Sequence, residues 1–62
     1  MKCVLIGYEM VSPAVLEMII EKEFDEAFVS WSDVDEDYFE FRVSGITDED
    51  LSLLEYILAA YV

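Results

Sequence analysis

The spacing of hydrophobic and polar positions changes along the chain. In the first half of the chain this spacing predicts a strand followed by a helix. Residues Lys2 to Tyr8 are rich in β-branched and aliphatic types with little polar alternation, which is typical of a strand covered on at least one face and shielded on the other. Ser12 and Pro13 then mark a helix start, with serine as N-cap and proline at the first helical position. Apolar residues recur at helical spacing to about Phe24. The predicted core face of this helix comprises Val15, Leu16, Ile19 and Ile20.

The second half of the chain changes to a period of two and then returns to helical spacing. One face of a second predicted strand comprises Ala27, Val29 and Trp31, and the other comprises Phe28, Ser30 and Ser32. After a polar connection, Asp33 to Asp37, a third strand alternates in the same way and is expected to form a hairpin with the second. Its apolar side is Phe39, Phe41 and Val43, and its other side is Tyr38, Glu40, Arg42 and Ser44. Gly45 ends the hairpin, and Thr47 caps a last, apolar helix.

These elements follow one another as β-α-β-β-α, and we expect residues 1–62 to form a single acidic α+β domain. Right-handed crossover favours a three-stranded antiparallel sheet with strand order 1-3-2, counted along the chain, and two helices on one face. This order resembles the first five elements of a ferredoxin-like split β-α-β fold, which normally continues into a fourth strand. The strand at residues 2–8 would then form an open apolar edge, which favours pairing with another chain.

The last predicted helix is apolar nearly all round. After its acidic first turn, only Ser52 and Glu55 are polar up to Val62. Such a helix needs cover on more than one side. Either the small core of the domain covers all the apolar sides of this helix, or homodimerisation or docking on a larger partner covers the sides that the core leaves exposed.

The composition is strongly acidic, with 15 Asp and Glu against three Lys and Arg and a formal charge of −12, while 56% of the residues are hydrophobic. So much apolar material predicts a folded chain. So few cations disfavour direct binding to nucleic acid or to an anionic membrane, and they indicate a basic partner protein. No apolar run approaches the roughly 20 residues of a bilayer span, and we expect a cytoplasmic chain. The single cysteine, Cys3, is expected to be a buried, inert thiol.

The predicted topology sorts most of the acids into two poles, because turns and helix ends alternate between the two ends of the domain. One end collects Glu21, Glu23, Asp25, Glu26, Asp48, Glu49 and Asp50. The other collects Glu9, Asp33, Asp35, Glu36 and Asp37. An ordinary soluble surface intersperses Lys and Arg with the acids, and this chain does not. The alternative interpretation is that acids at loops and helix N-termini serve solubility alone.

No motif indicates catalysis, a cofactor or a metal. The chain has no histidine to activate its serines and no glycine-rich loop for phosphates. Residues Asp33 to Asp37 read D-x-D-x-D, the opening of a calcium loop, but positions six and twelve hold Tyr38 and Ser44 in place of the glycine and glutamate that an EF-hand needs. We therefore expect no enzymatic activity, no cofactor and no metal site.

The composition is similar to that of small phage-encoded nucleic-acid mimics, which occupy the basic groove of a host nuclease, restriction enzyme, CRISPR effector or repair protein. The resemblance implies an inhibitor whose carboxylates replace phosphates. The residues expected to bind the partner are Asp33, Asp35, Glu36 and Asp37, with Asp48, Glu49 and Asp50 second. One alternative is a structural or assembly subunit, a homodimer that uses the apolar last helix and the edge strand. Another is an antitoxin-like partner of a basic toxin.

Overall fold

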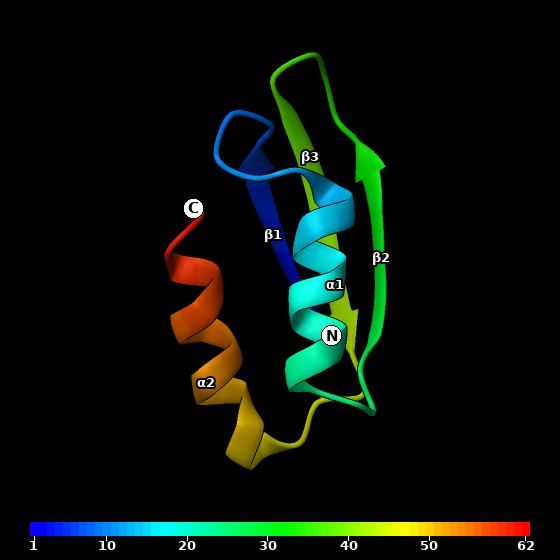
Figure 1. The fold of residues 1–62 in the computed structure, drawn as a ribbon, viewed down its shortest axis with the longest axis vertical. Helices are drawn as coiled ribbons and strands as arrows, with labels where there is room; N and C mark the ends of the chain where they lie inside the picture. Colours follow the sequence, from blue (N-terminus) through cyan, green and yellow to red (C-terminus); the bar gives the residue numbers. More distant parts are fainter.

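The computed structural model describes all 62 residues and has the predicted element order. The elements are β1 (Lys2–Gly7), α1 (Pro13–Glu23), β2 (Phe28–Asp33), β3 (Tyr38–Ser44) and α2 (Asp48–Ala59). The three strands form one antiparallel sheet in the order β1-β3-β2, which confirms the predicted fold class (Figure 1). Neither helix is long and apolar enough to cross a membrane.

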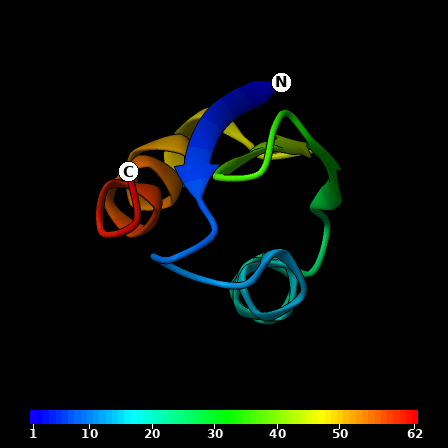
Figure 2. The same cartoon turned by 90° about the horizontal axis from the view of Figure 1, so that it is seen from above.

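The register of the sheet places the core-facing apolar positions of all three strands on one face. Val4 lies opposite Phe41 in the β1–β3 pair, and Val29 lies opposite Val43 in the β2–β3 pair. Residues directly opposite each other in an antiparallel pair have their side chains on the same side of the sheet. The buried cluster on this face draws on both helices and comprises Ile6, Leu16, Ile20, Phe24, Phe39, Phe41, Val43, Leu54 and Leu58. Figure 2 shows α1 facing the sheet across this core and α2 alongside β1.

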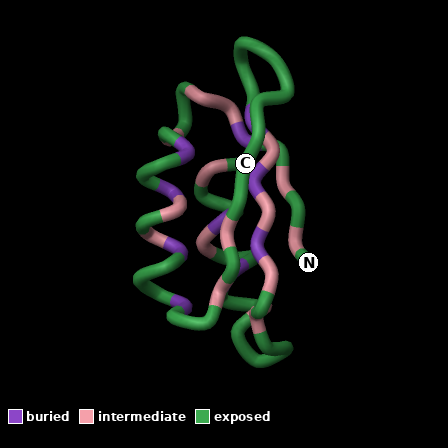
Figure 3. Tube along the Cα trace, turned by 90° about the vertical axis from the view of Figure 1, so that its right-hand side faces the viewer, coloured by how far each residue is buried: buried purple, intermediate pink, exposed green.

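Helix α1 begins as predicted but buries a narrower face than its sequence indicates. Pro13 occupies the first turn after Ser12, and Leu16 and Ile20 are buried. Figure 3 shows the buried positions of α1 along the side that faces the sheet. Val15, which the periodicity assigned to the core, is 48% exposed, and Ile19 is only half-buried. The assignment of Val15 is wrong and Ile19 is covered only in part, because so small a core has room for only the stripe of α1 that points straight at the sheet.

Helix α2 also leaves part of its apolar surface open. Leu54 and Leu58 are buried in the common core, but Leu53 is exposed and Tyr56 is 78% exposed. The small core therefore does not absorb the whole helix. The flank that contains Leu53 and Tyr56 is free in the structure.

The turn between β3 and α2 passes close to the turn between α1 and β2. Gly45 has a φ of +79°, and a Cβ at this position would lie 2.7 Å from the carbonyl oxygen of Glu26. Only glycine adopts this conformation at so close an approach without strain. Two residues later Thr47 caps α2, its Oγ1 accepting a hydrogen bond from the Asp50 N–H at 3.3 Å. These contacts hold the first turn of α2 next to the end of α1.

The second face of the sheet carries no helix. Cys3 and Leu5 lie on this face, because each stands opposite an outward-facing residue of β3, Arg42 and Glu40. Cys3 is exposed, so the expectation of a buried thiol is wrong. The apolar sequence of β1 suggested cover on both faces, but the fold supplies helices for only one.

Candidate functional site: the two acidic poles

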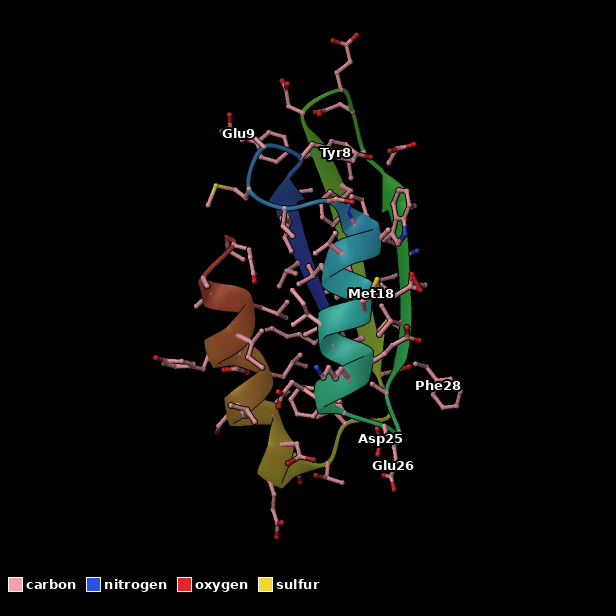
Figure 4. The ribbon with its side chains drawn as sticks, in the orientation of Figure 1. Tyr8, Glu9, Met18, Asp25, Glu26 and Phe28 are labelled. Carbon is pink, nitrogen blue, oxygen red and sulfur yellow. The ribbon has the colours of Figure 1, made fainter.

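The acidic residues gather at the two ends of an elongated molecule. Its principal extents are 33 × 18 × 18 Å. The turn after β1 and the β2–β3 connection lie at one end, and the α1–β2 turn and the start of α2 lie at the other (Figure 1). Figure 4 shows Glu9 at the first end and Asp25 and Glu26 at the second.

We call the first end the hairpin pole and the second the helix pole. The hairpin pole comprises Glu9, Asp33, Asp35, Glu36 and Asp37, all exposed. The helix pole comprises Glu21, Glu23, Asp25, Glu26, Asp48, Glu49 and Asp50, which are also exposed. The structure thus brings together Asp33, Asp35, Glu36 and Asp37, and it places Asp48, Glu49 and Asp50 at the opposite end.

The hairpin pole has a defined backbone shape. Oδ1 of Asp35 accepts hydrogen bonds from the backbone N–H groups of Asp37 at 2.8 Å and Tyr38 at 3.0 Å. The N–H of Tyr8 donates to the carbonyl oxygen of Asp37 at 2.9 Å, which ties the turn after β1 to the hairpin. A shallow hollow between the two turns is lined by Gly7, Tyr8, Glu9, Glu36, Asp37 and Tyr38. Carboxylates from two separate turns therefore sit around one surface depression.

Part of the helix pole has a structural explanation. Asp48, Glu49 and Asp50 form the first turn of α2, where backbone N–H groups and the positive end of the helix dipole stabilise negative charge. Lys22, in the last turn of α1, adds a positive charge near this end. The acids of the helix pole are therefore partly compensated by the fold itself.

The hairpin pole has no such compensation. Lys2 Nζ lies 3.7 Å from Glu55 Oε1, and Arg42 Nη1 lies 2.6 Å from Glu40 Oε1. Together with Lys22, these are all the lysine and arginine side chains of the chain. None of them belongs to the hairpin pole, so the only charged side chains at this end are carboxylates.

Neither pole is built as a metal centre. No group of three or more carboxylate or thiol side chains converges on one ion position. Because the carboxylates of both poles are exposed to solvent, the poles can form ion pairs and hydrogen bonds with a cationic surface. They present charge and no enclosed site.

Sequence reasoning missed two features of this surface. One carboxylate oxygen of Asp35 accepts a hydrogen bond from the backbone N–H of Asp37 and so stabilises the turn. Aspartate commonly accepts such a bond from the N–H two residues further along the chain. Arg42 lies flat on the open sheet face, where its Nε donates to Ser30 Oγ at 3.1 Å and its Nη1 donates to Ser32 Oγ at 3.0 Å. The turn signal was present in the sequence, whereas the arginine contacts depend on strand register.

Comparison of the chain with protein-family models, with curated proteins and with solved structures finds no match. Charge and geometry therefore carry the functional argument.

The role of Asp35 is open to a direct test. Asp35→Ala removes the acceptor for two backbone N–H groups and is expected to lower the free energy of unfolding by about 1 kcal/mol, measured by urea denaturation. Asp35→Asn keeps an oxygen acceptor and is expected to retain most of that stability. Glu36→Ala, which makes no backbone hydrogen bond, is the matched control. Equal losses for Asp35→Ala and Glu36→Ala would contradict the structural role.

Proposed function

We propose that this protein is a binding inhibitor that occupies the basic nucleic-acid-binding site of another protein, as a nucleic-acid mimic of the anti-restriction, anti-CRISPR or host-takeover type. The observation that supports it is the hairpin pole, where five carboxylates are exposed without any lysine or arginine among them. An acid-rich end that served solubility alone would not need to exclude cations, because mixed charges keep proteins soluble as well.

The separation of the poles also fits this function. The long axis measures 33 Å, close to the roughly 34 Å of one turn of duplex DNA. Phosphates that face the same side of a duplex recur once per turn, so a protein that contacts two such positions has two cationic patches at about this spacing. The hairpin and helix poles present negative charge at the two ends of a matching length.

The mechanism of the proposed inhibitor is electrostatic. The net charge of −12 steers the protein toward a cationic groove and accelerates association. Carboxylates then form the ion pairs that phosphates would make, and nucleic acid is excluded from the groove. Because a nucleic-acid-handling enzyme is the proposed target, the proposed site of action is the cytoplasm. A basic toxin would be bound by the same mechanism.

The experiment that tests the proposal is capture from a host lysate followed by competition. The tagged protein is washed at about 0.1 M and then about 0.5 M salt, between which the Debye length shrinks more than twofold. We expect a nucleic-acid-binding protein to be retained at low salt and released at high salt. The captured protein is then titrated with labelled nucleic acid, and the inhibitor is expected to displace it in a one-for-one competition.

Two results would overturn the proposal. One is a partner that survives the high-salt wash, since an electrostatic contact weakens steeply as salt rises. The other is a captured protein that binds nucleic acid and this chain at the same time.

A second candidate function is that of an assembly subunit, and the free flank of α2 with Leu53 and Tyr56 favours it. An assembly that buries this apolar flank would strengthen with salt, because salt screens the repulsion between acidic copies. Sedimentation of the protein alone at the same two salt concentrations therefore separates this function from mimicry.

A further inference from the structure

The outer edge of β1 presents backbone groups without a partner. The Tyr8 N–H donates to the Asp37 carbonyl at 2.9 Å and so continues the β1–β3 ladder. Alternate residues of a strand direct their N–H and C=O groups to opposite sides, so Val4 and Ile6 also face β3. The N–H and C=O groups of Cys3 and Leu5 therefore point outward, and no strand lies beyond β1 (Figure 1).

The space beside this edge has apolar contacts on both faces of the sheet. On the helix side a groove runs between β1 and α2, lined by Lys2, Val4, Glu55, Leu58, Ala59 and Val62. On the open side Cys3 is exposed and Leu5 is 50% exposed. A strand paired with β1 would place one set of side chains over the groove and the alternate set beside Cys3 and Leu5.

The charge pattern distinguishes this edge from the one on β2. The chain from Met1 to Tyr8 contains no carboxylate, and the one acid of the groove, Glu55, is paired with Lys2 at 3.7 Å. The outer edge of β2 includes Asp33 and runs directly into the hairpin pole. On a molecule with a charge of −12, the β1 edge is the edge that an apolar strand can approach without meeting unpaired acids.

A second copy of this chain fits the edge poorly. Two copies would each bring twelve net negative charges. They would also bring two α2 helices, which run alongside β1 (Figures 1 and 2). Paired strands lie about 4.8 Å apart, whereas packed helices need about 8 to 10 Å. An extended segment that carries no helix avoids both conflicts.

We propose that the β1 edge accepts an extended segment of a partner protein as a fourth strand, with apolar residues in its centre and basic residues at its ends. β1 has six residues and so spans about 20 Å, less than the 33 Å long axis. The two ends of an added strand therefore reach toward the two acidic poles. For this reason we expect basic residues at both ends of the partner segment. Backbone hydrogen bonds to Cys3 and Leu5 supply the attachment.

The probe for this site is the acetylated and amidated peptide Lys-Lys-Val-Thr-Val-Thr-Val-Lys-Lys. Its matched control carries N-methyl groups on alternate backbone amides, which removes strand-pairing donors and leaves the charge unchanged. We expect the unmodified peptide to bind at least about tenfold more tightly than the control, by calorimetry. On binding, amide exchange at Cys3 and Leu5 is expected to slow.

Two variants locate the contact on the protein. Leu5→Pro removes an outward donor and leaves the β1–β3 ladder intact, so the fold is expected to persist while the preference for the unmodified peptide is lost. Leu5→Ala keeps the N–H and is expected to retain that preference. If Leu5→Pro does not fold, amide exchange at Cys3 and Leu5 in the wild-type protein, with and without the peptide, still locates the contact.

Three results would overturn this assignment. One is equal binding of the two peptides, which reduces the contact to charge. Another is slowed exchange at Val29 and Trp31 on β2 in place of Cys3 and Leu5. The third is protection of Cys3 and Leu5 by self-association of the protein alone. The test does not depend on the proposed mimicry. Variants with a neutralised hairpin pole are expected to keep the preference for the unmodified peptide.

Discussion

Replacement of Phe39 by alanine is expected to unfold most of the protein at 25 °C. Phe39 is fully buried, and its ring contacts Tyr8, Trp31 and Phe41 at centroid distances of 5.1, 6.1 and 6.4 Å. Truncation of a buried phenylalanine costs about 3–5 kcal/mol. The core of so short a chain rarely supplies more than about 3–5 kcal/mol of net stability, so the loss is comparable to the whole.

Circular dichroism and the fluorescence of Trp31, the only tryptophan, measure this loss. Tyr38→Ala is the control, because Tyr38 is the neighbouring aromatic residue of β3 but points to the open face, where it is 44% exposed. We expect the control to lose no more than about 1 kcal/mol. A cooperative transition in Phe39→Ala with the wild-type midpoint would show that the core does not depend on this aromatic cluster.

Neutralisation of the hairpin pole is expected to weaken binding to the captured partner and to stabilise the free protein. The triple variant Asp33→Asn, Glu36→Gln, Asp37→Asn removes three charges and leaves the Asp35 turn in place. If each carboxylate replaces one phosphate, the slope of log K against log salt becomes less negative by roughly three, and affinity at low salt falls by about 100-fold or more. Less self-repulsion raises the thermal midpoint by a few degrees.

The matched control removes the same number of charges from the other end, with Asp48→Asn, Glu49→Gln and Asp50→Asn. These residues stabilise the first turn of α2, so this triple variant is expected to be less stable than the wild-type protein. The hairpin-pole variant is expected to be more stable. Affinity and its salt slope are measured for both variants by calorimetry or fluorescence titration. Equal losses of affinity would mean that only net charge matters and would contradict the assignment of the hairpin pole as the main contact.

The fold was accessible from the sequence because its signals are local and agree with one another. The strict alternation of Phe39, Phe41 and Val43 with polar neighbours defines the buried face of β3, and Ser12-Pro13 and Thr47 mark the two helix starts. The errors at Val15 and Cys3 have a different origin. Local periodicity identifies apolar positions, but the number of them that are covered depends on how many layers the fold supplies, and this fold supplies helices on one face only.

The poles were also predictable, because topology alone sorts turns between the two ends of the domain. The sequence did not reveal which hydrogen bonds and neighbours the individual acidic residues have within each pole. Asp35 is partly engaged by backbone N–H groups, and Asp37 contributes its carbonyl oxygen to Tyr8. The carboxylates of Glu9 and Glu36 line one hollow only because the two turns meet in space. Such contacts depend on long-range geometry that no local pattern contains.

Two unpaired strand edges on so small a sheet also determine how the protein behaves in concentrated solution. Outward backbone groups at both edges are templates for aggregation, and natural proteins commonly protect them with charge. Here that protection is the long-range repulsion between acidic copies, which acts over about 10 Å at 0.1 M salt and far less at higher ionic strength. We therefore expect the acidity to act also as a colloidal stabiliser, which keeps copies of the open sheet apart in solution.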